Sequence, residues 1–114
     1  MIAAALALLA AAPASAHSEL RRSSPAPGAV LATPPERVEL LFNDRVQLTA
    51  LRLYRVGAGE IALPDRRSIR EAREETVRLP PLEPGAYRLE WRAISADGHP
   101  VGGAIGFTVA PPAR

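Results

Sequence analysis

The feature that most constrains this chain is an alternation of apolar and polar residues with a period of two. Four short runs show it, and each has one apolar face that a strand in a half-buried sheet would turn inward. Pro and Gly separate the runs: the chain of 114 residues contains 12 Pro and 8 Gly. Such spacing is typical of a β-sandwich or a small barrel, so we expect one all-β domain. The expected inward-facing residues are Val38, Leu40, Phe42, Leu51, Leu53, Leu89, Trp91, Ile105, Phe107 and Val109.

In two segments the sequence pattern indicates the secondary structure less directly. In the second run, strict alternation places Thr49 on the same face as Leu51 and Leu53. Residues 66–75 contain a Ser and a Glu with the spacing of a helix capping box, but the segment is short and polar. We expect it to be a loop with room for one helical turn.

The charged residues do not form a basic surface. All 14 basic residues are Arg, set against 12 Asp and Glu, and the formal net charge is +2. In residues 66–75 Arg alternates with Glu, whereas nucleic-acid-binding proteins concentrate positive charge, so we exclude nucleic acid as a partner. The chain has no Cys and few aromatic residues, which predicts an aliphatic core without disulfides or a large ligand cavity.

The first sixteen residues have the pattern of a signal peptide. Residues 2–12 are all apolar, and Pro13 and an Ala-Ser-Ala sequence ending at Ala16 follow. This run is too short to cross a bilayer as a helix, which needs roughly twenty residues. No basic residue precedes the run, which fits a start codon upstream of Met1, and an unstructured Ala-rich leader is the alternative. We expect cleavage after Ala16, export to the periplasm and a mature domain of residues 17–114.

The two His residues of the chain are the strongest candidates for chemistry. His17 becomes the mature N-terminus, where its α-amino nitrogen and imidazole can chelate one ion. His99 follows Asp97 by two residues, so both side chains can converge on one point. These donors form a mixed N,O set that suits Cu(II), with Zn(II) as the next candidate. Asp97-Gly98 is also an ordinary hairpin-turn signal, so a purely structural role is the alternative.

The chain resembles the CopC family of periplasmic copper-resistance proteins over nearly all of its mature length. The resemblance rests on motifs that occur in the family's order: a leader, a mature N-terminal His, a Ser-Pro-x-x-Gly-Ala element, a Trp-Arg-x-x-Ser-x-Asp-Gly-His-Pro element and a terminal strand. The leader is residues 1–16, and the other matching residues are 17–20, 24–29, 34, 38–40, 42–44, 85–101 and 105–109.

The resemblance implies an immunoglobulin-like Greek-key β-sandwich or barrel of about seven strands. It further implies one Cu(II) site formed by His17, Asp97 and His99, and Asp44 matches an acidic position that lies near this site in some relatives. Other members carry a second, Cu(I) site made of Met residues and a His. The mature chain has no Met, so we expect a single Cu(II) site and no Met-rich Cu(I) site.

The function that the resemblance implies is a monomeric periplasmic copper carrier or buffer that acts in copper homeostasis and resistance without catalysis. A CopD-type inner-membrane protein is its implied partner. A copper-dependent redox enzyme is a second hypothesis, because lytic polysaccharide monooxygenases also use an N-terminal His chelate. Against it, an anionic ligand such as Asp97 favours Cu(II) over Cu(I). The third hypothesis is a purely structural immunoglobulin-like module.

Overall fold

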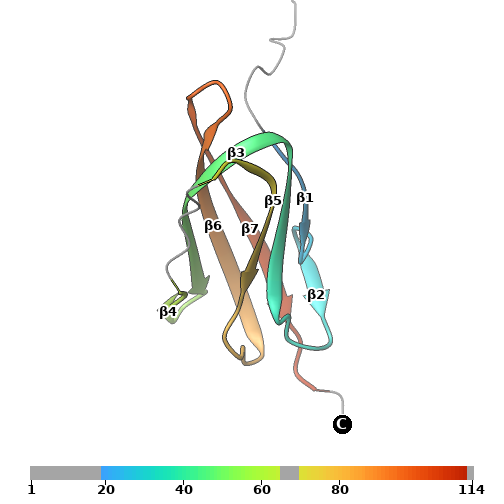
Figure 1. Ribbon diagram of the computed structural model, residues 1–114. Coiled ribbons are helices and arrows are strands. Elements are labelled where there is room, and N and C mark those ends of the chain that lie inside the picture. The colour runs from blue at the N-terminus through green and yellow to red at the C-terminus, as the bar shows by residue number, and fades with distance from the viewer. Residues whose placement is uncertain (1–18, 65–69, 113–114) are drawn as a thin grey trace, which may run out of the picture.

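The computed structural model describes residues 19–64 and 70–112, which form seven strands and no helix (Figure 1). The expected leader, its cleavage point and His17 lie outside the described residues. Within them, no helix has the length and apolarity needed to cross a bilayer. The expectation of an all-β fold of about seven strands is confirmed. The strands are β1 (Leu20–Ser24), β2 (Ala29–Leu31), β3 (Arg37–Arg55), β4 (Gly59–Ile61), β5 (Ala72–Arg78), β6 (Gly85–Ser95) and β7 (Pro100–Val109).

Strand β3 belongs to both layers of the fold. Its first part, residues 37–41, lies between β1 and β5, and its second part, residues 46–55, pairs with β6. Between the two parts the register shifts, and β3 arches over one end of the molecule (Figure 1). The strand order is β1-β3-β6-β7-β2, and residues 25–28 connect β1 and β2, the two strands at the ends of this order. The result is a sandwich-like barrel.

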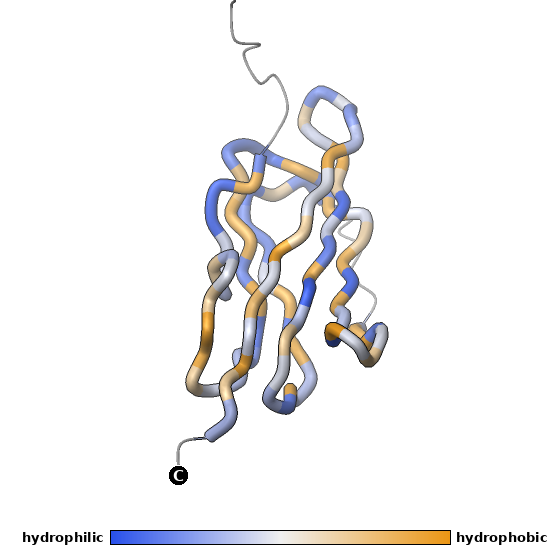
Figure 2. The backbone as a smooth tube through the Cα atoms, turned by 180° about the vertical axis from the view of Figure 1, so that it is seen from behind, coloured by the Kyte–Doolittle hydropathy of each residue, from blue (hydrophilic) through white to orange (hydrophobic). Residues whose placement is uncertain are grey.

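The core is the set of inward-facing residues of this curled sheet. All ten residues expected to be inward are at most 8% exposed, and the alternation along the backbone is visible in Figure 2. Phe42 and Trp91 pack edge to face with ring centroids 5.1 Å apart, and Tyr87 stacks on Phe107 at 5.4 Å. Both aromatic pairs join residues from different strands. The core also includes Val46, Leu48, Val77, Leu82, Tyr87 and Ala93.

Two sequence expectations are wrong. Thr49 does not share the face of Leu51, because the pairing of β3 with β6 shifts between Leu48 and Ala50 and turns Leu48 inward instead. Residues 72–75 are not a loop but the first part of β5, which pairs with residues 37–46 of β3. The segment is rich in polar residues because β5 pairs with one strand only, which leaves much of β5 exposed to solvent. Residues 65–69 lie outside the described chain.

The entry into β6 contains a tyrosine corner. The hydroxyl of Tyr87 donates a hydrogen bond to the backbone carbonyl of Glu83, and the guanidinium of Arg55 donates one to the carbonyl of Pro84 at 2.7 Å. A Tyr near the start of a strand, bonded to the backbone a few residues upstream, is typical of immunoglobulin-like sandwiches. These bonds fix the direction in which β6 leaves the loop.

Trp91→Ala should destabilise the domain strongly. Trp91 is 5% exposed and contacts Phe42, so its removal leaves a cavity that costs about 3–5 kcal/mol of unfolding free energy. Urea unfolding followed by far-UV circular dichroism measures this loss. Val56→Ala is the matched control, because Val56 is 65% exposed and its truncation should change stability by less than about 0.5 kcal/mol. Equal midpoints for wild type and Trp91→Ala would contradict the packing.

Candidate metal centre

The turn between β6 and β7 carries both described candidate ligands. The N–H of Ser95 donates to the carbonyl of His99 at 2.8 Å, and the N–H of Gly98 donates to the carbonyl of Ser95 at 2.9 Å. Gly98 has a φ of +85°, which only Gly adopts without strain. The hairpin expected from Asp97-Gly98 is therefore confirmed, and it holds Asp97 and His99 on one short loop.

The side chains of Asp97 and His99 contact each other. Nδ1 of His99 lies 3.1 Å from Oδ2 of Asp97, and the side chains are 61% and 39% exposed, respectively. The hydroxyl of Ser95 donates a hydrogen bond to Oδ1 of Asp97 and accepts one from the N–H of His99 at 3.1 Å. The bond from Ser95, together with His99, lowers the pKa of Asp97 below its usual value. Asp97 is thus an ionised carboxylate at neutral pH.

The bend of β3 lies at the same end of the molecule as this turn. Val46 is paired with Ser95, which brings residues 43–46 to the base of the hairpin. Asn43 also fixes the start of the described chain, since its side-chain oxygen accepts the N–H of Glu19 at 2.7 Å and its own N–H donates to the Glu19 carbonyl at 2.9 Å. Figure 1 shows the hairpin, the bend of β3 and the beginning of β1 at one end.

This arrangement places Glu19, the first described residue, at the same end of the fold as the bend of β3 and the β6–β7 turn. Glu19, clamped by Asn43, follows His17 by two residues, although His17 itself lies outside the described chain. Asp44 lies on the bend, where its carboxylate accepts the N–H of Arg45 at 2.7 Å. Among residues 19–64 and 70–112, no three His, Asp or Glu side chains form a group able to hold a metal ion. The described residues therefore contribute the Asp97–His99 pair, and Asp44 does not join it.

Ser95 and Asn43 have positioning roles in the structure that were not among the sequence expectations. Ser95 is 2% exposed, and its hydroxyl is hydrogen-bonded to both Asp97 and His99. The position of Ser95, two residues before Asp97, could have indicated this role, because Ser side chains commonly hydrogen-bond to groups two to four residues away. No local pattern pointed to Asn43, since its partner Glu19 is far away in sequence.

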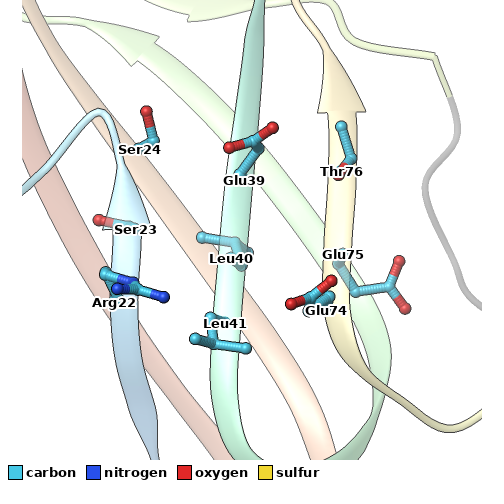
Figure 3. Close-up of a pocket in the computed structure, with 9 residues that line it drawn as sticks. All are labelled: Arg22, Ser23, Ser24, Glu39, Leu40, Leu41, Glu74, Glu75 and Thr76. Carbon is cyan, nitrogen blue, oxygen red and sulfur yellow. The ribbon is translucent and has the colours of Figure 1, made fainter.

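The structure has a hollow of about 250 Å³ away from this turn. Outward-facing residues of β1, β3 and β5 line it, including Arg22, Glu39 and Glu74 (Figure 3). Side chains of both charge signs and an apolar floor at Leu41 surround it. It shares no residue with the β6–β7 hairpin and supplies nothing to the candidate metal centre.

Comparisons with known proteins give one consistent result. A family model described as the CopC domain matches residues 20–110. The chain is 35% identical over 99 residues to the copper transport protein CutJ of Bacillus subtilis (strain 168), covering 82% of this chain but only 18% of that protein. It is 32% identical over 106 residues to copper resistance protein C of Escherichia coli, covering 84% and 83% of the two chains.

Solved structures agree with these relatives. The crystal structure of CopC from Methylosinus trichosporium OB3b superposes with a TM-score of 0.73 at 28% identity, covering 86% of this chain and 98% of that one. PcoC from Escherichia coli, described as a methionine-rich copper resistance protein, superposes with a TM-score of 0.65 at 31% identity, covering 82% and 99%.

Ser95→Ala should raise the pKa of Asp97 towards its usual value. The hydroxyl of Ser95 is the main group that stabilises the ionised carboxylate in the folded protein. Because the folded-state pKa is lowered, this interaction stabilises the fold above the usual Asp pKa and is lost as the pH falls through the lowered value. A carbon-detected NMR titration of the Asp97 carboxyl measures the shift. Ser24→Ala, an exposed Ser on β1, is the control and should leave it unchanged.

Proposed function

The chain belongs to the CopC domain family, as its motifs predicted, and we propose that it is an exported Cu(II)-binding protein that acts as a carrier or buffer in copper homeostasis. The observation that carries this proposal is the Asp97–His99 pair on the β6–β7 turn, at the end of the fold where the described chain begins. Relatives named as copper resistance and copper transport proteins support it.

The proposed ligands are the amine and imidazole of His17, the carboxylate of Asp97 and the imidazole of His99. The clamp between Glu19 and Asn43 supports this set, because it fixes the chain two residues after His17 at the end that carries the hairpin. Three nitrogens and one carboxylate oxygen match the preference of Cu(II) for a tetragonal N,O environment. Asp44, on the bend of β3, adds negative charge at this end without taking a ligand position.

The same residues favour Cu(II) over Cu(I). An ionised carboxylate is a hard ligand, whereas Cu(I) prefers thioether and thiolate sulfur. The single Met of the chain is Met1, and the chain has no Cys. PcoC of Escherichia coli, by contrast, is described as methionine-rich. We therefore propose one Cu(II) site and no Met-rich Cu(I) site.

The proposed carrier role follows from this preference. A site that stabilises Cu(II) holds and releases the ion without redox cycling, so the proposal includes no catalysis. The leader would direct export of the monomeric protein to the periplasm, and cleavage after Ala16 would create the amine of His17. A CopD-type inner-membrane protein is the proposed acceptor. The relative CutJ supports a link to transport, since the matched region is a small part of that longer copper transport protein.

His99→Ala should abolish tight Cu(II) binding and leave the apo fold nearly unchanged. His99 lies on an exposed turn and contributes little packing, whereas loss of one ligand removes much of the binding energy of a metal. Competition titration of the mature protein gives the affinity, and urea unfolding without copper gives the stability. Glu60→Ala, on β4, is the control and should bind normally. Equal affinity for wild type and His99→Ala would overturn the site.

One Gly added before His17 should weaken Cu(II) binding about as much as His17→Ala. In the extended protein the nitrogen of His17 belongs to a peptide bond, where its lone pair is delocalised and it no longer acts as an amine donor. Electron paramagnetic resonance of the Cu(II)-loaded protein should show altered nitrogen hyperfine structure. Addition of one Gly after Arg114 is the matched control. Full affinity and an unchanged spectrum for the N-terminally extended protein would remove the amine from the ligand set.

A further inference from the structure

Strand β7 has an open edge over half of its length. One side of β7 pairs with β6 along residues 100–109, but on the other side β2 pairs only with residues 107–109. The carbonyl of Gly106 accepts the N–H of Gly28 at 2.7 Å, so Gly106 faces the side of β2. Since backbone groups in a strand point to alternate sides, Gly102 and Ala104 face the same way. In the described chain, no strand pairs with them on that side.

This edge lacks the protection that the other edges have. Exposed sheet edges are usually blunted by charged side chains or by shortness, because free N–H and C=O groups accept further strands. Arg21 and Arg22 lie on β1, and β5 carries several Arg and Glu residues. β2 and β4 are three residues long. Residues 101–105 of β7 carry no charge and include two Gly.

The surface beside the open edge is a hollow with a basic rim. It measures about 420 Å³ and lies between Arg88, Glu90 and Arg92 of β6 and residues 102–104 of β7. Arg88 pairs with Glu90 at 3.1 Å. Arg92 lies opposite Gly102 and has no ion-pair partner among the described residues. The rim therefore carries one uncompensated positive charge.

The indole of Trp91 lies beside this edge. Trp91 is 5% exposed and is one of the residues that line the hollow. The indole covers Gly103: a Cβ added there would lie 2.9 Å from Nε1. A strand added at the edge would therefore change the surroundings of the indole.

We propose that the open edge of β7 at Gly102 and Ala104 binds an extended, acidic segment of another protein by adding it as a strand to the sheet. Backbone hydrogen bonds to Gly102 and Ala104 supply the binding, and acidic side chains of the segment reach over the small residues of β7 to Arg92. This mode is β-augmentation, in which main-chain bonds give affinity and side chains give specificity. The proposal rests on the fold and does not depend on copper.

The rim charges decide against a second copy of this chain as the occupant. An antiparallel pair centred on Ala104 would place Gly102 opposite Gly106 of the other copy. Arg92 lies opposite Gly102 and Arg88 lies opposite Gly106 within the sheet. A second copy would therefore place a basic residue, Arg88, in the same cross-strand row as Arg92, and it would offer no acidic side chain there. The acidic side chains of an added segment would instead be attracted to Arg92.

The test uses short capped peptides with the copper-free mature protein. In one peptide Val alternates with Glu, and in its counterpart Val alternates with Lys. The Glu peptide should shift the NMR signals of the Gly102 and Ala104 amides, slow their hydrogen exchange and change the fluorescence of Trp91. It should bind at least about tenfold more tightly than the Lys peptide at low salt.

Variants at two residues separate edge pairing from general charge attraction. Ala104→Pro removes the N–H that faces the open edge but none that pairs with β6, so it should abolish binding, whereas Ala104→Val keeps that N–H and should bind. Arg92→Glu should reverse the preference between the two peptides, and it keeps the test decisive if Ala104→Pro does not fold. The proposal is overturned by no binding at millimolar peptide, by equal binding of both peptides, or by a dimer that protects Gly102 and Ala104.

Discussion

The pairing of β3 with both layers is the constraint on which the rest of the structure depends. Its first part is held between β1 and β5, its second part by β6, and the register shifts where it bends. That bend puts Asn43 where it clamps Glu19 and puts Val46 beside Ser95. A strand that stayed in one layer would not bring Glu19, where the described chain begins, to the same end as the β6–β7 turn. The candidate metal centre therefore exists because one long strand crosses the end of the barrel.

Much of the fold follows from local patterns. Alternation predicted most of the buried face of the long strands β3, β6 and β7, because one-sided burial requires a period of two. The Asp-Gly pair predicted the β6–β7 turn, and in the structure Gly98 adopts the positive φ that this turn requires. The bulge near Thr49 and the pairing of β5 did not follow. Both features depend on the neighbouring strand. The bulge near Thr49 occurs where β3 pairs with β6, and the polar residues of β5 form a strand only because they pair with β3.

The same division holds for the candidate site. The spacing of Asp97 and His99 predicted a shared turn, and the structure places their side chains 3.1 Å apart. Their orientation depends on Ser95, a buried hydroxyl that bonds to both residues. Sequence motifs include this Ser without revealing its role. The clamp between Glu19 and Asn43 spans two distant segments, and only the folded chain shows that they meet.

The turn that carries Asp97 and His99 directly precedes the strand with the open edge. His99 ends the turn, Pro100 begins β7, and Gly102 and Ala104 follow on the open side. A strand added at Gly102 and Ala104 would therefore run close to the turn that carries Asp97 and His99. Carboxylates of an acidic segment are hard oxygen donors, which suit Cu(II). The proposed carrier must bind its ion tightly and also release it. An acceptor whose acidic segment pairs with the edge would bring competing oxygen ligands close to Asp97 and His99.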